Sequence, residues 1–471
     1  MSSPVLTTAQ MRQWEQATWA TGQTESEVIR RVGEIVARRA LAMTRAGDQI
    51  LILAGKGHNG DDARLAEPHL RDRKVALLNV VDPASSLTEF VPLAERRSKL
   101  IIDGLFGIGL NRALDAKWVR FIEQINETRI PILAVDLASG LNADTGEPFG
   151  AALKASVTLT LGAIKAGLLS PAAWPFVGRL EVAPEIGLVP CPFDTELNWT
   201  LAEDFFYYPP PRLVVAHKGT FGHLAIIAGS LGYHGAAVLA SRGAQRARPG
   251  LVTLCVLENV YDPVASQLQA VMVRPYLREP DLPDSSTAIL CGPGLASDDL
   301  PASLKSSIVT LWQKSTLPMI VDASALDWLP NGPTTTDALR VLTPHPGEVA
   351  RLLQTSSAKV QADRPAAVRE LSRCFGNCWV VLKGHQTLIG RSEGKIFVNS
   401  SGNPFLAQGG SGDVLAGFIG GLLAQPELQS DAEKVLRYAV WQHGAAADQL
   451  QETRANWTVE NLVESLGSFG R

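Results

Sequence analysis

The residues best suited to chemistry lie in one glycine-rich stretch, Gly402–Gly421, near the end of the sequence. The glycines of Gly409–Gly412 permit backbone conformations closed to other residues, and Val414–Leu423 has the small apolar composition of a buried helix. A glycine turn that opens a helix directs free N–H groups and the positive end of the helix dipole at one point, which suits phosphate. Asp413 adds a carboxylate there. Capping alone would explain an isolated acid, but the glycines favour an anion hole with a base.

Polar motifs also follow three apolar runs in the first half, over Ala54–Asp62, Asp103–Arg112 and Val135–Leu141. If the three loops converge, Asn59, Asp103 and Ser139 surround a monovalent cation with hard oxygen ligands. The glycines after Asp103 could wrap a phosphate, with Arg112 as the counter-charge. Helix capping and plain turns explain any one motif equally well. Three motifs at successive strand ends favour a binding site.

A dinucleotide-binding loop is an alternative for the first of these motifs. The segment Gly55–Gly60 has the G-x-G-x-x-G spacing, and Asp82 ends the next apolar run at about the distance of a ribose-binding acid. Against this interpretation, Asp61 and Asp62 place carboxylates in the loop, where they would repel a pyrophosphate.

The second half places polar residues after its apolar runs too. Lys383 alone is most simply a solvated lysine at a strand end, but with Thr387 and the Gly409–Asp413 turn it resembles one wall of a phosphate site. His345 lies between two prolines, so its backbone is stiff. Its ring could be a neighbour of a helix N-cap or a rigidly aimed polar contact.

The elements that must position these residues alternate between strand and helix patterns. Short apolar runs predict strands, listed here in chain order: 49–54, 74–81, 99–103, 132–136, 157–161, 223–228, 251–257, 287–291, 318–322 and 379–383. Helical spacing lies between them, for example over 25–43, 236–248, 300–313 and 365–375. This alternation predicts an α/β fold made of two three-layer αβα domains, in which ligands bind at the carboxyl ends of the strands.

Length and composition limit the possibilities further. A chain of 471 residues predicts two domains, and proline-rich 189–211 predicts a stiff linker, with domains over 1–205 and 206–471. The formal net charge of −4 argues against a nucleic-acid partner. No run is apolar enough for a membrane span, no secretory signal is visible, and the five cysteines form no C-x-x-C pair. We therefore expect a cytoplasmic protein with reduced thiols.

The first-half motifs carry a resemblance to a known family. Gly-Lys-Gly-His-Asn-Gly at 55–60, Asp-Gly-Leu-Phe-Gly-Ile-Gly-Leu at 103–110 and Val-Asp-Leu-Ala-Ser-Gly at 135–140 resemble the N-terminal epimerase domain of NAD(P)H-hydrate repair enzymes, which implies a Rossmann-like parallel sheet. The resemblance implies potassium at Asn59, Asp103 and Ser139, and Asp136 as the acid–base group against the hydrated ring. The implied substrate contacts, besides Asp136, are His58, Asn59, Gly60, Asp61, Asp62, Gly107, Ile108, Gly109, Leu110, Asn111 and Arg112.

The chain departs from that family at two positions. Asp61 and Ala63 stand where the family usually has glycine. A glycine lets the backbone approach a ligand, and an aspartate would adopt a positive φ only at some cost. We therefore predict that epimerisation is present but impaired, and that Asp61→Gly raises its rate.

The second half resembles the ribokinase-like fold and, more narrowly, the ADP-dependent NAD(P)H-hydrate dehydratases. The motifs are His217–Gly222, Gly292–Gly294, Thr343–Glu348, Val381–Gly384 and Gly409–Gly417. The resemblance implies ADP as phosphoryl donor, with Mg²⁺, and NADHX and NADPHX as substrates. The hydrate contacts would be Ala236, Gly294, His345 and Asp413, and the nucleotide contacts Lys383, Gly384, His385, Gln386, Thr387 and Gly412.

The expected chemistry gives Asp413 a specific role. Hydroxide is a poor leaving group, whereas a phosphorylated hydroxyl leaves as phosphate, expelled by the ring nitrogen. That route needs a base on the hydroxyl, for which we choose Asp413, and an anion hole around Gly410–Gly412. Two alternatives stay open: a ribokinase-like small-molecule kinase with an N-terminal nucleotide-binding module, and a first half that is a non-catalytic assembly module. We also expect a homo-oligomer.

Overall fold

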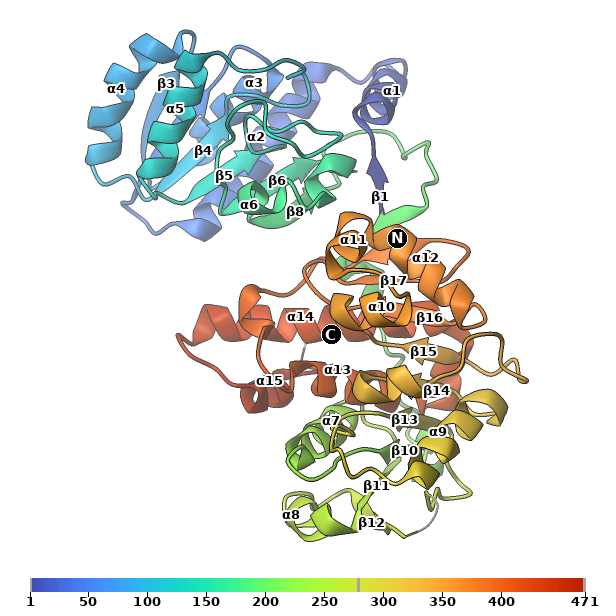
Figure 1. Ribbon diagram of the computed structural model, residues 1–471. Helices are drawn as coiled ribbons and strands as arrows, with labels where there is room; N and C mark the ends of the chain where they lie inside the picture. The colour runs from blue at the N-terminus through green and yellow to red at the C-terminus, as the bar shows by residue number, and fades with distance from the viewer. Residues whose placement is uncertain (1, 278–279, 469–471) are drawn as a thin grey trace. The chain divides into compact units, whose positions relative to one another are not determined.

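The computed structural model describes residues 2–277 and 280–468, which form two compact units, Ser3–Thr195 and the chain from Glu196 onward. Both units alternate strands with helices (Figure 1). The predicted boundary near residue 205 differs from this division, because Leu197–Trp199 is a strand that pairs in parallel with Ile396–Val398 of the second unit. Part of the predicted linker is thus built into a sheet.

The first unit is organised around a parallel sheet with the order β3-β2-β4-β5-β6-β8. Its strands are β1 (Ser3–Leu6), β2 (Gln49–Ala54), β3 (Lys74–Asn79), β4 (Leu100–Gly104), β5 (Ile132–Val135), β6 (Val157–Leu161), β7 (Ile164–Lys165) and β8 (Arg179–Ala183). The short strands β1 and β7 pair in parallel outside this sheet. Its helices are α1 (Thr8–Trp19), α2 (Glu25–Met43), α3 (His58–Arg64), α4 (Pro83–Glu95), α5 (Ala116–Glu127) and α6 (Trp174–Val177).

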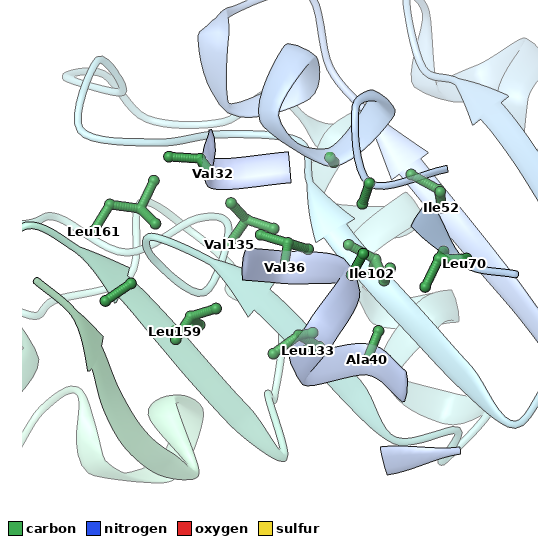
Figure 2. Close-up of a cluster of buried hydrophobic side chains, with 14 of the residues drawn as sticks. Val32, Val36, Ala40, Ile52, Leu70, Ile102, Leu133, Val135, Leu159 and Leu161 are labelled. Carbon is green, nitrogen blue, oxygen red and sulfur yellow. The ribbon is translucent and has the colours of Figure 1, made fainter. Parts of the chain in front are cut away.

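Alternate side chains along the strands of this sheet pack against helices on its two opposite faces. Ile50 and Ile52 of β2 belong to the core beneath α2, where Val32 and Val36 pack over the sheet (Figure 2). Leu51 and its β2 neighbours on the other face pack with residues of α4 and α5. This period of two is the pattern of a strand buried on both sides, and it makes the unit a three-layer αβα sandwich.

The second unit holds a mixed sheet with the order β12-β11-β10-β13-β14-β15-β16-β17-β18-β9. Its strands are β9 (Leu197–Trp199), β10 (His223–Ile227), β11 (Leu251–Leu257), β12 (Met272–Tyr276), β13 (Ala288–Cys291), β14 (Met319–Val321), β15 (Arg340–Leu342), β16 (Trp379–Leu382), β17 (Leu388–Gly390) and β18 (Ile396–Val398). Strands β10 to β16 run parallel, and β16, β17 and β18 are antiparallel neighbours.

Helices contact strands along most of this sheet, from α8 on β12 to α12 and α14 on β17 (Figure 1). They are α7 (His234–Arg246), α8 (Tyr261–Ala265), α9 (Ala302–Lys314), α10 (Pro346–Leu352), α11 (Ser357–Ala362), α12 (Arg364–Cys374), α13 (Ser411–Leu423), α14 (Ala432–Thr453) and α15 (Val459–Ser465). Helix α13 packs on β10, β13 and β14 and against α7. A β-carbon at Gly417 would lie 1.9 Å from the Ala240 carbonyl oxygen, so the small residues of α13 are needed for this close helix contact.

In each sheet the strand order reverses at one point, and the predicted loops lie there. β2 pairs with both β3 and β4, which places the loops after β2 and β4 side by side. β10 pairs with both β11 and β13, which does the same for the loops after β10 and β13. Such switch points at the carboxyl ends of parallel strands are where α/β proteins bind ligands. The helices in the described ranges are too short or too polar to cross a membrane.

Candidate functional sites

A cavity of about 770 Å³ opens at the switch point of the first unit. Its lining includes every residue of the loop Gly107–Arg112, together with His58, Asn59, Asp62 and Asp136. These residues are far apart in the sequence, and the loops after β2, β4 and β5 bring them together. Gly60 and Asp61, which were predicted alongside them, do not line the cavity.

The three predicted cation ligands converge beside this cavity. The Asp103 carboxylate is fully buried and accepts hydrogen bonds from the Ser139 hydroxyl at 2.6 Å and the Ser139 N–H at 2.9 Å. The Asn59 amide donates to the Phe106 carbonyl oxygen at 3.0 Å, and Ser139 Oγ lies 3.3 Å from that oxygen. Burial raises the pKa of Asp103 to about 6, and its hydrogen bonds oppose the shift. Carboxylate, hydroxyl, amide and carbonyl oxygens make a hard donor set.

Asp136 is held in the cavity by a buried ion pair that sequence analysis did not include in the site. Its Oδ1 accepts from Lys165 Nζ and, at 3.0 Å, from the Leu161 N–H. The Lys165 side chain is 1% exposed and also donates to the Leu161 carbonyl at 2.7 Å. Asp136 has φ +67°, a conformation that costs a residue with a side chain some strain. Within the described residues its Oδ2 has no protein partner, so this oxygen is free for a ligand.

Asp61 does not lie where the sequence predicted. It is a residue of helix α3 without a positive φ, and its carboxylate pairs with Arg64 Nη1 at 2.7 Å, away from the cavity. Ala63 is buried against Gly104, whose missing β-carbon leaves it room. The expectation that Asp61 crowds the ligand through a strained backbone is therefore wrong. Both departures from the family pattern fit an ordinary helix.

The glycine turn of the second unit has the geometry that an anion hole would require. Gly410 precedes α13 with φ +95°, the left-handed conformation that favours glycine. The N–H groups of Gly412 and Asp413 have no protein acceptor in the described part of the chain. Lys383 Nζ lies 3.4 Å from the position of a β-carbon at Gly412. Free N–H groups, a helix N-terminus and an ammonium thus converge on one point.

Asp413 is a poor helix cap and a good candidate for a base. The N-cap of α13 is Gly410, which has no side chain, and Asp413 stands in the first turn without a capping role. Burial, with the nearby Asp322 carboxylate, raises the pKa of Asp413 to about 7, while Lys383 opposes the shift. A carboxyl with a pKa near neutrality is poised to accept a proton.

Lys383 is tied to a partner that was not predicted for the site. Its Nζ donates at 2.6 Å to the buried Asp322, which follows β14. Burial alone would lower the pKa of Lys383, but Asp322, Glu348 and Asp413 together raise it. The lysine stays charged beside the anion hole. Asp322 could have been found from the sequence, because it ends a predicted strand as Asp103 and Asp136 do.

His345 is itself the N-cap of helix α10. Its Nδ1 accepts from the N–H groups of Gly347 at 3.0 Å and Glu348 at 3.3 Å, which caps helix α10. When the ring is neutral, its proton is therefore on Nε2, which lies 3.5 Å from Glu348 Oε1 on a half-exposed ring. The Pro344 carbonyl next to it accepts from the Lys383 N–H at 2.8 Å, which joins the two loops.

Ala236 and Gly294 meet at the second switch point. Gly294 has φ +66°, and a β-carbon there would lie 2.8 Å from Ala236 Cβ. Ser230 donates to the Gly294 carbonyl at 2.7 Å and fixes this loop. Leu239, one turn along α7 from Ala236, packs against Gly410, so this wall lies next to the anion hole.

Comparison with known proteins agrees with this arrangement. The family profile described as NAD(P)H-hydrate dehydratase matches residues 224–466, and the profile described as YjeF-related protein N-terminus matches residues 77–167. The bifunctional NAD(P)H-hydrate repair enzyme Nnr of Coxiella burnetii is 33% identical over 94% of this chain and 94% of its own length. The chain belongs to the bifunctional NAD(P)H-hydrate repair enzyme family.

Solved structures resemble the second unit of this family member. The ADP/ATP-dependent NAD(P)H-hydrate dehydratase from Bacillus subtilis, co-crystallised with ATP and Mg²⁺, is 30% identical with a TM-score of 0.50, covering 56% of this chain and 96% of that one. A ribokinase-like superfamily protein from Enterococcus faecalis is 25% identical with a TM-score of 0.50, covering 59% and 96%. The predicted α/β fold, with a Rossmann-like first sheet and a ribokinase-like second one, is confirmed.

Proposed function

We propose that the chain repairs hydrated NAD(P)H, with epimerisation of R- and S-NAD(P)HX in the unit Ser3–Thr195 and ADP-dependent dehydration of S-NAD(P)HX in the unit from Glu196. One observation carries the assignment of dehydration. Burial raises the pKa of the Asp413 carboxyl to about 7. This carboxyl lies beside the free N–H of Gly412 and the charged Lys383. Family membership along nearly the whole chain supports both activities.

The proposed dehydration balances without a redox step. Asp413 accepts the proton of the hydrate hydroxyl. The hydroxyl oxygen of the hydrate then takes the terminal phosphoryl group of ADP, and AMP is the leaving group. The anion hole and Lys383 stabilise the charge of the transferring group. The C–O bond then breaks as the ring nitrogen donates its lone pair, releasing phosphate, and loss of a proton from the adjacent ring carbon gives NAD(P)H. We assign nucleotide contacts to Lys383–Thr387 and Gly412, and hydrate contacts to Ala236, Gly294 and His345.

We infer that Mg²⁺ enters the second unit together with the nucleotide. The described residues contain no group of three His, Cys, Asp or Glu side chains arranged as metal ligands. Mg²⁺ is commonly held by substrate phosphates with only one or two carboxylates, so the residues present fit an ion carried by the donor. When bound, it would supply positive charge to the phosphates.

We propose that epimerisation uses the Asp136–Lys165 pair. The hydroxyl-bearing carbon of the hydrate also carries the ring nitrogen, whose lone pair can expel the protonated hydroxyl as water. Water can then add back to the same carbon on the other face, which restores the lone pair and inverts the carbon. The free Oδ2 of Asp136 would carry the proton to and from that oxygen, while Lys165 holds Oδ1. Asn59, Asp103 and Ser139 would hold K⁺, whose charge offsets the burial of Asp103. The loop Gly107–Arg112 would bind substrate phosphate.

The full chain tests the proposal directly. Mixed hydrate epimers are incubated with ADP, and the absorbance of the reduced nicotinamide ring is followed. We expect both epimers to be recovered as NAD(P)H, with AMP and phosphate as co-products. Recovery of one epimer alone would refute the epimerase assignment. A stable phosphorylated product would instead favour the small-molecule kinase, which the family match does not support. Cytoplasmic location and homo-oligomerisation remain predictions.

Substitution of Asp61 tests the corrected placement of this residue. We now expect Asp61→Gly to change the epimerisation rate by less than about threefold, as for a surface position away from the site. The free energy of unfolding should fall by about 1 kcal/mol, because glycine disfavours a helix and the Arg64 pair is lost. Rates of S/R interconversion and thermal unfolding measure both effects.

The neighbouring Asp62 is the matched control for this prediction. It lines the cavity and is buried, and burial followed by the charge of Asp136 raises its pKa well above the usual value. Asp62→Ala should therefore impair epimerisation more than Asp61→Ala does. A marked rise in rate on Asp61→Gly would restore the original view that Asp61 hinders the ligand.

A further inference from the structure

A buried arginine lies directly beneath the proposed nucleotide loop. Arg364 is the first residue of α12 and is 6% exposed. Its guanidinium donates to the carbonyls of Leu382 at 3.1 Å, Lys383 at 3.4 Å and Gln386 at 3.4 Å, and also to that of His385. One side chain therefore contacts the carbonyl that ends β16 and three of the five carbonyls between β16 and β17.

These hydrogen bonds determine where the N–H groups of the loop point. A trans peptide holds its C=O and N–H on opposite sides, so carbonyls that face Arg364 turn the following N–H groups away from it. The N–H groups of Gly384 and Gln386 follow the carbonyls of Lys383 and His385, and neither N–H has a protein acceptor in the described part of the chain. They are left free on the exposed side of the loop, as in backbone nests that bind anions.

The loop adopts this conformation at a cost. Gly384 has φ +129°, and Gln386 has φ +51°, the left-handed region that a residue with a β-carbon seldom occupies. The four Arg364 contacts offset that cost, since hydrogen bonds from a charged donor are among the stronger ones. Without Arg364, we expect the loop to relax and its N–H groups to lose their common direction.

The charge of Arg364 also lacks a counter-ion. No carboxylate in the described residues lies within ion-pair distance of its guanidinium, and burial lowers the pKa of Arg364 to about 10. A buried cation without an anion is unfavourable unless something compensates it. An anionic ligand on the outer side of the loop would supply that compensation.

We propose that Arg364 is a positioning residue for the phosphorylated nucleotide: it shapes the Lys383–Thr387 loop so that the Gly384 and Gln386 N–H groups face the ligand. The inference rests on the proposed function, which places the donor at this loop. Arg364 acts through the loop, from the side opposite the ligand, and the proposed hydrate contacts at Ala236 and Gly294 belong to other segments. Loss of Arg364 should therefore weaken nucleotide binding more than hydrate binding.

The chain offers a matched control in Arg340. This arginine is also buried, and its guanidinium donates to the carbonyls of Trp312 at 2.7 Å, Ser315 at 2.6 Å and Leu317 at 3.0 Å. Burial lowers the pKa of Arg340 to about 10 as well. It begins β15, at the amino-terminal edge of the parallel strands, whereas the nucleotide loop follows the carboxyl end of β16. Arg340 therefore binds backbone carbonyls from a buried position as Arg364 does, but at a place remote from the proposed nucleotide loop.

The test compares Arg364→Met, Arg364→Lys and Arg340→Met in the full chain. Dehydration is measured at varied ADP with saturating hydrate and at varied hydrate with saturating ADP, and ADP binding is measured by calorimetry. We expect Arg364→Met to raise the KM and Kd for ADP by about tenfold or more, with the KM for hydrate changed less than about threefold. Arg364→Lys keeps the charge but loses the planar guanidinium, so its ADP affinity should lie between that of the unmodified chain and that of Arg364→Met. Arg340→Met should lower the Tm and leave ADP affinity within about threefold.

Several outcomes would overturn the inference. Equal increases in both KM values, or an increase in the ADP KM of Arg340→Met that matches Arg364→Met, would mean that Arg364 only stabilises the fold. Failure of both Arg364 variants to fold would have the same meaning. The proposed function fails separately, because it predicts that the unmodified chain forms NAD(P)H, and that result is independent of any difference among the variants.

Discussion

Replacing Asp413 with asparagine is expected to lower the rate of ADP-dependent dehydration by about 10²- to 10⁴-fold, the usual contribution of a general base. Asparagine keeps the size of the side chain but cannot take the proton of the hydrate hydroxyl. Because Gly410, and not Asp413, is the N-cap of α13, the start of that helix should be undisturbed. Nucleotide affinity should therefore be retained, and calorimetry with ADP measures it independently of turnover.

The pH dependence gives this prediction a second readout. Burial raises the pKa of Asp413 to about 7, and a base must be ionised to act. In the unmodified chain, kcat/KM for dehydration should therefore rise with pH through about 7 and then level off. The residual rate of Asp413→Asn should lack that limb. Near-normal turnover in the variant would remove Asp413 from the role of base.

Asp431→Asn provides the matched control for Asp413→Asn. Asp431 caps α14, and its carboxylate accepts from the Lys434 N–H at 3.0 Å, so it plays the capping role that was the alternative for Asp413. Asparagine caps a helix about as well as aspartate, and a cap contributes no chemistry. We therefore expect Asp431→Asn to leave both the Tm and the rate of dehydration nearly unchanged.

The sequence was most informative where chemistry follows strand ends. The strand patterns 49–54, 157–161 and 251–257 match β2, β6 and β11, because strands covered on both faces are buried along nearly their whole length and read as short apolar runs. Since parallel strands end at one edge, the polar residues after them had to meet, and Asp103 and Ser139 do. Their convergence was therefore predictable without side-chain geometry.

Contacts that depend on side-chain direction could not be predicted in this way. Lys165 follows an apolar strand and gives no local sign that it turns back to Asp136. Arg364 stands before a proline at a helix start, a context typical of a surface cap, yet it is buried beneath a loop more than fifteen residues away in sequence. Asp61 was misplaced for the same reason: its helix directs it to Arg64, which the motif alone does not reveal.

The Asp136–Lys165 pair leads to the second large effect that we expect. Asp136→Asn should lower the rate of S/R interconversion by about 10²- to 10⁴-fold, because the amide can still accept from Lys165 but cannot carry a proton. ADP-dependent dehydration of the S epimer should be unchanged, since Asp413 and its partners lie in the other unit. Chiral separation of the hydrates, after incubation without ADP, measures the first rate in isolation.

Folding of the first unit must be checked separately, because breaking a buried ion pair can cost about 3–5 kcal/mol. Glu181→Gln is a suitable control: Glu181 forms a bidentate, partly buried pair with Arg39, at 2.6 and 2.9 Å, and neither residue lines the cavity. If loss of stability alone were responsible, the two variants would lose epimerisation in proportion to their loss of Tm. If Asp136 carries the proton, Asp136→Asn loses the activity while still folded, and Glu181→Gln keeps it. A folded Asp136→Asn chain that interconverts the epimers at the normal rate would refute the assignment.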